Sequence, residues 1–152
     1  MNESITNNRE LVCEAKRLAD RNWIEGYYHK QIFGKLENEC EITSFIRQIN
    51  NLVSTIIDPT TLRQYTNFNT KGGDRVFEGN IVEYKCGSSE ARIGVVVYIK
   101  TLGIFAIQRM PNHEFTNYGT NKYSAFVNKT TRVLGRIDDN PQYFEKDGDN
   151  NE

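Results

Sequence analysis

The stretch 76–86, VFEGNIVEYKC, decides how the fold of this chain of 152 residues is interpreted. Apolar and polar residues nearly take turns along it, a pattern typical of a strand with one buried side. The segment Glu78-Gly79-Asn80 interrupts that pattern. A phosphate-binding loop would need several glycines and a Lys followed by Ser or Thr, and this stretch has neither. We therefore predict a corner at Gly79, with positive φ or a bulge, from which a strand begins.

Segments of similar pattern continue on both sides of this stretch, separated by turn residues. The strands expected toward the C-terminus are 80–86, 92–100, 104–108, 123–127 and 132–137. Those expected toward the N-terminus are 23–28, 41–46 and 52–57, the last two joined as a hairpin at Asn50-Asn51. Many short strands at this spacing predict a small barrel or a folded-over sheet.

Proline, glycine and asparagine mark where these strands end. Asp58-Pro59 ends a strand, because proline has no amide hydrogen to donate to a neighbouring strand. We expect one helical turn within TTLRQY (60–65), and a loop at NFNTKGGD (67–74), whose Asn, Gly and Asp tolerate positive φ. Asn140-Pro141 is typical of an N-cap followed by the first helical residue, so a short C-terminal helix is expected over 141–145.

One segment is ambiguous between helix and strand. ELVCEAKRLAD (10–20) is rich in good helix formers and has four apolar residues near helical spacing, Leu11, Ala15, Leu18 and Ala19. Intrinsic propensity alone therefore predicts a helix in this segment.

The chain carries a net charge of −1 that is unevenly distributed. From Asp138 onward there are six acidic residues and one basic residue, whereas the preceding part has 14 acidic and 18 basic residues. We expect a mobile N-terminus at 1–8 and a disordered acidic tail at 146–152. The alternative is an acidic arm that shields a weakly basic surface from nucleic acid, although the pI near 6.2 is far from that of a typical DNA-binding domain.

The composition argues against several classes of protein. No stretch approaches the ~18 consecutive apolar residues of a membrane span, and no secretory signal pattern is visible, so no membrane partner is expected. The three cysteines, Cys13, Cys40 and Cys86, are odd in number and widely spaced. Such usage favours a reducing, cytoplasmic location over a disulfide framework.

The sequence contains no pattern of a catalytic or metal site. His29 and His113 are far apart, and neither has a Cys or carboxylate at ligand spacing, so neither a metal nor a cofactor is expected. No Gly-x-Ser-x-Gly motif occurs. Because catalytic triads assemble in space, a hydrolase or deaminase built from distant residues stays open as an alternative to a protein without enzymatic activity.

The most distinctive local feature is the aromatic stretch WIEGYY (23–28). A nucleic-acid platform would need interleaved Lys and Arg, and this stretch has only the flanking Arg21 and Lys30. We therefore expect an aromatic strand with a glycine kink. Tyr27 and Tyr28 must face opposite sides of that strand, which leaves one of them available to a partner.

Five fragments of the chain match one family, in the same order along the sequence. They are NRELVCEAKRLADRNWIEGYY (8–28), LRQYTN (62–67), RVFEGNIVEY (75–84), RIGVVVY (92–98) and RVLGRIDDNPQYFE (132–145). Together they resemble the YopX family, small proteins carried by bacteriophages and prophages. The resemblance runs over nearly the whole chain, although residues 31–57 match poorly and are expected to form a variable hairpin insertion.

The chain also departs from the family pattern at single positions. Asn80 stands where the family usually has Asp, which argues against an acid or metal role at that corner. Arg63 and Asn67 stand where glycines usually flank Gln-Tyr-Thr, and Arg136 replaces the usual Asn. Asn67 can still adopt positive φ, so the turn there is expected to survive.

The resemblance implies a single mostly β domain over 9–145, with a strongly bent sheet that forms a partly closed, SH3-like barrel. It also implies that 9–18 is a strand, against its local helix propensity. The family motifs imply residues of structural importance. These are the backbone-shaping Gly26, Gly79, Gly94 and Gly135, the core residues Trp23, Tyr65, Phe77 and Val82, and Pro141 at the start of the C-terminal helix.

The resemblance brings no catalytic residues with it, because the family is largely uncharacterised. The leading hypothesis is a non-enzymatic phage or prophage accessory protein that binds a host or phage macromolecule, either a protein or a nucleic acid. The first alternative is a small-barrel nucleic-acid-binding module with an acidic autoinhibitory tail, and the second is the hydrolase described above. Open sheet edges also favour self-association into a homo-oligomer.

Overall fold

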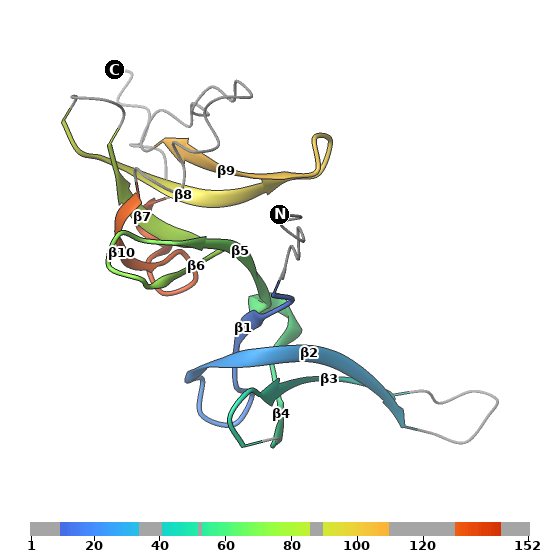
Figure 1. Cartoon of the computed structure of the whole chain (residues 1–152). Helices are drawn as coiled ribbons and strands as arrows, with labels where there is room; N and C mark the ends of the chain where they lie inside the picture. Colours follow the sequence, from blue (N-terminus) through green and yellow to red (C-terminus); the bar gives the residue numbers. More distant parts are fainter. Residues whose placement is uncertain (1–9, 34–40, 52, 86–89, 110–129, 144–152) are drawn as a thin grey trace, which may run out of the picture. The chain divides into compact units, whose positions relative to one another are not determined.

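The computed structural model describes residues 10–33, 41–51, 53–85, 90–109 and 130–143. These residues form antiparallel strands and two short 3-10 turns, and no α-helix occurs among them. The prediction of a mainly β protein is therefore confirmed (Figure 1). No helix in this described part is long and apolar enough to cross a membrane.

The chain divides into two compact units. The N-terminal unit comprises residues 1–67 and the C-terminal unit residues 68–152. That residues 9–145 fold as one domain stays a prediction.

The N-terminal unit contains four strands and the first part of a fifth. They are β1 (Cys13–Lys16), β2 (Trp23–Phe33), β3 (Glu41–Gln48), β4 (Ser54–Ile56) and β5 (Arg63–Asn69), with the 3-10 turn η1 (Pro59–Thr61) before β5. The strands lie in the order β4-β3-β2-β1-β5, and β6 follows β5 in the same sheet. The expected hairpin at Asn50-Asn51 is confirmed, because β3 and β4 pair antiparallel with Phe45 opposite Ile56.

The core of the N-terminal unit is small and aliphatic. Its buried members are Ala15, Ile24, Ile46 and Ile57. Beyond β4 the chain meets the end of β1, where Arg17 and Ile57 form an antiparallel bridge. The amide of Asp58 donates to the carbonyl of Lys16 at 2.9 Å in the same place. The sheet is therefore bent far enough for the chain after β4 to contact the end of β1.

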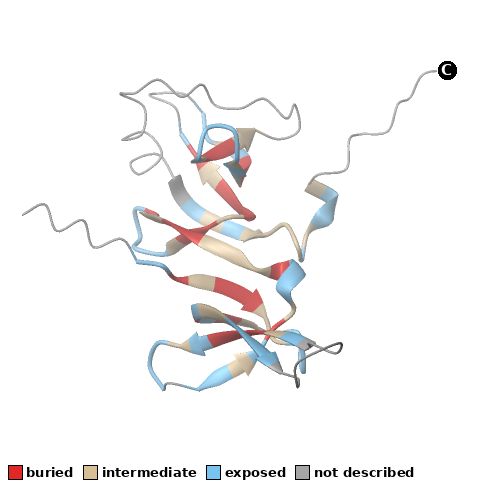
Figure 2. Ribbon diagram, turned by 90° about the vertical axis from the view of Figure 1, so that its right-hand side faces the viewer, coloured by how far each residue is buried: buried red, intermediate tan, exposed pale blue. Residues whose placement is uncertain are grey.

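The C-terminal unit contains a second antiparallel sheet. Besides β6 (Arg75–Phe77), which belongs to the first sheet, the strands of this unit are β7 (Asn80–Tyr84), β8 (Arg92–Ile99), β9 (Ile104–Arg109) and β10 (Thr130–Arg136), followed by the 3-10 turn η2 (Pro141–Tyr143). The sheet has the order β10-β7-β8-β9. Its apolar core consists of Val76, Val82, Tyr84, Val96 and Ile107. Buried residues lie mainly in the strands of each unit, and exposed residues lie mainly in the turns (Figure 2).

The corner predicted at Gly79 is confirmed. Gly79 has a φ of 77°, in the region that favours glycine, and β7 begins at the next residue, Asn80. The Gly79 amide donates to the carbonyl of Val96 at 2.7 Å, and the Asn80 side chain accepts the amide of Phe77 at 2.8 Å. The Gly79 amide and the Asn80 side chain therefore form hydrogen bonds with other parts of the backbone, and these bonds stabilise the corner.

Within the ambiguous segment 10–20, residues Cys13–Lys16 form the strand β1, which is shorter than the strand that the family resemblance implies at 9–18. In a helix, Leu11 and Leu18 would share the apolar side with Ala15. In the structure both leucines are exposed, at 66% and 58%, whereas Ala15 is completely buried opposite Ile24 of β2. Pairing with β2 on one side and with β5 on the other thus outweighs the local helix propensity.

Three local predictions are wrong. The turn expected within 60–65 lies earlier, at Pro59–Thr61, where Asp58 caps it and proline occupies its start. The loop expected at 67–74 is a loop only from residue 70, because β5 continues to Asn69. The C-terminal helix expected at 141–145 is a single 3-10 turn, Pro141–Tyr143, in the described part of the chain.

Several predictions fall outside the described residues. They are the strand at 123–127, the mobile N-terminus at 1–8, the disordered tail at 146–152, and the positions of Cys40, Cys86 and His113.

Candidate functional site

The aromatic strand β2 separates its side chains onto two sides of the sheet. Ile24 is buried in the core of the N-terminal unit, and Tyr28 packs against that core. Strand alternation places Trp23 and Tyr27 on the opposite side. Tyr27 is 50% exposed there, so the prediction that Tyr27 and Tyr28 face opposite ways is confirmed.

Side chains from β1 and β3 border this aromatic side of β2. The β2 outer face consists of Trp23, Glu25, Tyr27 and His29, with their cross-strand neighbours Lys16, Phe45 and Arg47. The Lys16 Nζ atom lies 5.4 Å from the centroid of the Trp23 ring. The rings of His29 and Phe45 stack with centroids 5.3 Å apart and an angle of 11° between their planes. Tyr27 lies directly opposite the exposed Arg47.

The cations beside the aromatic residues were missed in the sequence because they come from neighbouring strands. Arg21 and Lys30, which flank the aromatic stretch in sequence, lie elsewhere: Arg21 binds Asp58, and Lys30 is on the same side of β2 as Tyr28. Lys16 and Arg47 take their place through the β1–β2 and β2–β3 registers. Lys16 and Arg47 could be assigned to this surface from the sequence only if the turns that join these strands, and therefore their registers, were known.

Carboxylates also lie on this side of the sheet. Glu14 of β1 is completely buried, and its cross-strand neighbours are Glu25 on β2 and Arg63 on β5. Glu25 is exposed between Trp23 and Tyr27. A buried carboxylate beside an arginine on the next strand is typical of a structural charge pair, and by itself does not indicate catalysis.

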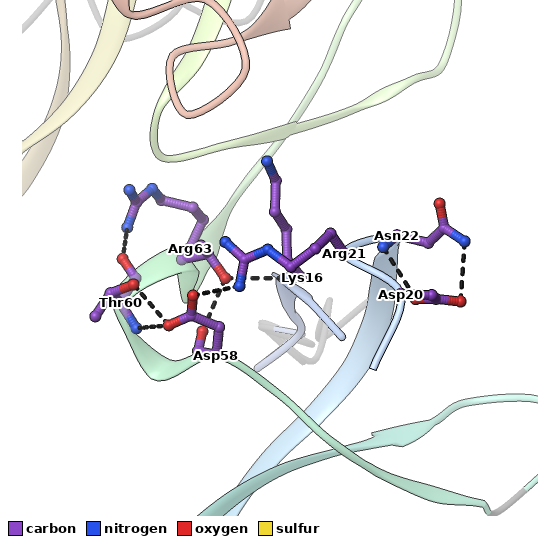
Figure 3. A network of polar contacts seen from close by, with 8 residues as sticks. Lys16, Asp20, Arg21, Asn22, Asp58, Thr60 and Arg63 are labelled. Carbon is purple, nitrogen blue, oxygen red and sulfur yellow. Dashed lines mark hydrogen bonds and ion pairs between the residues drawn. The ribbon is translucent and has the colours of Figure 1, made fainter. Parts of the chain in front are cut away.

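A polar network fixes the end of β1 and the chain that follows β4 (Figure 3). The Asp58 Oδ1 atom accepts hydrogen bonds from the Thr60 hydroxyl at 2.6 Å and the Thr60 amide at 3.0 Å. Its Oδ2 atom accepts from Arg21 Nη1 at 2.6 Å. The hydrogen bonds from Thr60 and Arg21 lower the pKa of Asp58 from 3.8 to about 2.

The β1–β2 turn is held by a second carboxylate. Asp20 accepts the Asn22 amide at 3.1 Å and pairs with Arg17 Nη2 at 2.8 Å. These contacts, the Asn22 amide first, lower the pKa of Asp20. Arg21 turns the chain with a φ of 61°. The turn is therefore built from specific polar contacts, and it returns the chain so that Trp23 lies opposite Lys16.

The Asp58 network predicts a dependence of stability on pH. The folded pKa is below the unfolded value of 3.8, so the stabilisation is complete above about pH 4 and is lost as the pH falls through about 2. Asp58→Asn is expected to cost about 1 kcal/mol at pH 7. Urea unfolding of both proteins between pH 7 and pH 2 measures the difference, which should disappear toward the acid end. A difference that is constant over this range would contradict the assignment.

The residues selected from the family motifs lie mainly in the strands of the two units. Tyr65, Phe77 and Val82 are buried, at 6%, 2% and 0% exposure, whereas Trp23 is half-buried. Asn67 has a φ of 65°, so the predicted positive φ is confirmed even though β5 continues through this residue.

The remaining selected residues are glycines and a proline. Gly26 and Gly94 are buried in β2 and β8, where an added Cβ atom would overlap atoms of the neighbouring strand. Gly135 lies in β10, and an added Cβ atom there would be 3.0 Å from Asn140 Nδ2. Pro141 begins the turn η2 and is exposed.

Metal-ligating residues do not gather in the described ranges of the chain. Within them, no group of three or more His, Cys, Asp or Glu side chains is placed to hold a metal ion. Cys13 on β1 is half-buried and does not belong to a disulfide.

Comparison with known proteins gives a family but no relative of known function. Neither the curated proteins nor the solved structures contain a significant match. A family model described as YopX protein matches residues 8–145, which is most of the chain. The strands, corners and buried glycines described above all lie within that range. The chain therefore belongs to the YopX family.

Proposed function

We propose that this protein is a non-enzymatic phage or prophage accessory protein that acts by binding a macromolecule through the β2 outer face. The observation that carries the proposal is the cross-strand pairing of aromatic and cationic side chains. Trp23 lies opposite Lys16, and the half-exposed Tyr27 lies opposite Arg47. Exposed aromatic and arginine side chains are the residues that most often dominate binding energy at interfaces.

The location of this surface on a strand favours binding over catalysis. Side chains on paired strands are held in fixed positions, and the β1–β2 turn and the β2–β3 pairing determine which of them are neighbours. Of the two carboxylates on this side of the sheet, Glu14 is completely buried and Glu25 is exposed. Such a surface is suited to contacting an extended ligand along β2.

We further propose that the N-terminal unit is a partly closed barrel of the SH3-like kind. Three features support it: the strand order β5-β1-β2-β3-β4, the 3-10 turn between β4 and β5, and the bridge between Arg17 and Ile57. Small barrels of this kind serve many unrelated functions, so the fold supports a binding role without defining the ligand. An experimental structure in which the chain after β4 is separated from β1 would contradict this architecture.

Photo-crosslinking tests the binding face without assuming the ligand. A photoreactive phenylalanine analogue placed at Tyr27 is expected to crosslink a macromolecule in a lysate of the bacterial host. The same analogue at Tyr98 is the matched control, because Tyr98 is a tyrosine of similar exposure, 42%, on β8 of the C-terminal unit.

The outcome separates a binding face from non-specific contact. A product formed at position 27, absent at position 98 and reduced by Arg47→Ala, supports the proposal. Equal products at the two positions, or none at either, would overturn it. Digestion of the product with nuclease or protease then identifies the chemical class of the ligand.

A further inference from the structure

We infer that the ligand of the β2 outer face is a single-stranded nucleic acid, with bases stacked on the aromatic rings and phosphates near Lys16 and Arg47. This inference rests on the proposed function, because it names the partner of the same face. It is drawn from side chains that the fold brings together from three strands. These are Lys16 on β1, Trp23, Tyr27 and His29 on β2, and Phe45 and Arg47 on β3.

The aromatic residues provide the stacking surface. Tyr27 is half-exposed and Trp23 and His29 are half-buried, whereas Phe45 is buried, so Tyr27 is the principal stacking residue. Tyr27 and His29 are separated by two positions, which is about 7 Å along a strand. A single strand that is extended beyond its stacked repeat of about 3.4 Å can place successive bases on them. The near-parallel stacking of His29 on Phe45 helps to fix the orientation of the His29 ring.

The two cations lie on either side of β2. Lys16 approaches from β1 and Arg47 from β3, so a backbone that runs along β2 passes near both. Aromatic platforms bordered by Lys and Arg are the usual way in which proteins bind single strands without sequence preference. A duplex does not fit the same site, because its bases are already stacked and paired.

One exposed carboxylate on this face opposes the ligand. Glu25 is exposed between Trp23 and Tyr27, and its neighbour Glu14 is buried with Arg63 as the cross-strand residue on its other side. The cationic excess at the surface is therefore small, and most of the affinity must come from stacking. With two phosphate contacts, the slope of log affinity against log salt is expected to be about −1.4 for a single strand.

Fluorescence anisotropy with the full chain tests the inference. The probes are labelled oligothymidylate and oligouridylate of equal length and a labelled DNA duplex, titrated between about 50 and 200 mM salt. Both single strands are expected to bind and the duplex to bind at least tenfold more weakly. The difference between the two single strands reports whether DNA or RNA is preferred.

Three substitutions separate stacking from charge. Tyr27→Ala is expected to weaken single-strand binding by about tenfold. Arg47→Ala should make the salt slope shallower by about 0.7. Glu25→Gln should tighten binding several-fold, because it removes the carboxylate nearest to the phosphates. Tyr98→Ala is the matched control and is expected to bind like the wild type, and thermal unfolding of every variant verifies that it is folded.

The results distinguish this inference from the proposed function. The inference that the ligand is a single-stranded nucleic acid would be overturned by any of three results. These are no binding of the single strands, equally tight binding of the duplex, or an unchanged affinity of Tyr27→Ala for the single strands. If a protein is crosslinked at position 27 at the same time, the proposed binding face stands and only its ligand was wrong. If neither an oligonucleotide nor a crosslinked product is found, both fail.

Discussion

Replacing Gly26 with alanine is expected to lower the free energy of unfolding by about 3 kcal/mol. Gly26 is buried in β2, opposite Gln48 of β3. A Cβ atom added to Gly26 would overlap the carbonyl oxygen of Arg47 and would lie 2.8 Å from Cγ2 of Ile46. Because the first of these neighbours is backbone, no side-chain rotation relieves the overlap, and the β2–β3 pairing itself must shift.

Urea unfolding followed by circular dichroism measures this effect, and Gly72→Ala is the matched control. A Cβ atom at Gly72 would lie 3.6 Å from Thr70 Oγ1 and 3.8 Å from Asp74 Oδ2, which are ordinary contacts. The control should therefore remain within about 0.5 kcal/mol of the wild type. If Gly26→Ala unfolds at the same urea concentration as the control, the close approach of β3 to Gly26 is not a constraint on the fold.

Replacing Phe77 with alanine is expected to cost about 4 kcal/mol. Phe77 is among the largest fully buried side chains, with 2% exposure, and it ends β6 just before the Gly79 corner. Its amide is held by the Asn80 side chain at 2.8 Å. The backbone at this position is thus fixed, so the structure has little freedom to collapse into the cavity that truncation leaves.

Ile93→Ala is the control for Phe77→Ala, since Ile93 of β8 is 37% exposed and should cost about 1 kcal/mol or less. Equal costs for the two substitutions would contradict the cavity argument.

Hydrogen exchange of Phe77→Ala also tests whether 9–145 is one domain. A single domain loses protection in both units together, whereas loss confined to 68–152 would show that the N-terminal unit unfolds independently.

Local sequence signals located most of the described strands because these signals act over a few residues. Alternation of apolar and polar residues identified β7, the consecutive valines 95–97 identified β8, and turn residues identified the β3–β4 hairpin. Glycine at position 79 predicted the corner there, because the tolerance of a positive φ depends on a single residue. The failures also arose from short-range rules. Turn-forming residues predicted a helical turn within 60–65 and a loop at 67–74, but pairing with β1 places residues 63–69 in the strand β5.

The candidate site could not be predicted from the sequence in the same way. The stretch 23–28 was identified as an aromatic strand, and the cations that a nucleic-acid platform needs were sought among its sequence neighbours. The structure instead places Lys16 and Arg47 there. The strand register determines which residues lie opposite each other. A shift of one residue in the register would move Lys16 and Arg47 to the other side of the sheet.

By itself, the sequence determined the mainly β class, the corner at Gly79, the end of a strand at Asp58-Pro59 and, through its ordered motifs, the YopX family. These features depend on backbone preferences of single residues and on two-residue periodicity. Only the tertiary structure decided that the strand implied at 9–18 is limited to Cys13–Lys16 and that Lys16 and Arg47 border the aromatic residues of β2. The physical reason is that such contacts join residues distant in sequence, and their free energy is gained only when the strands have paired.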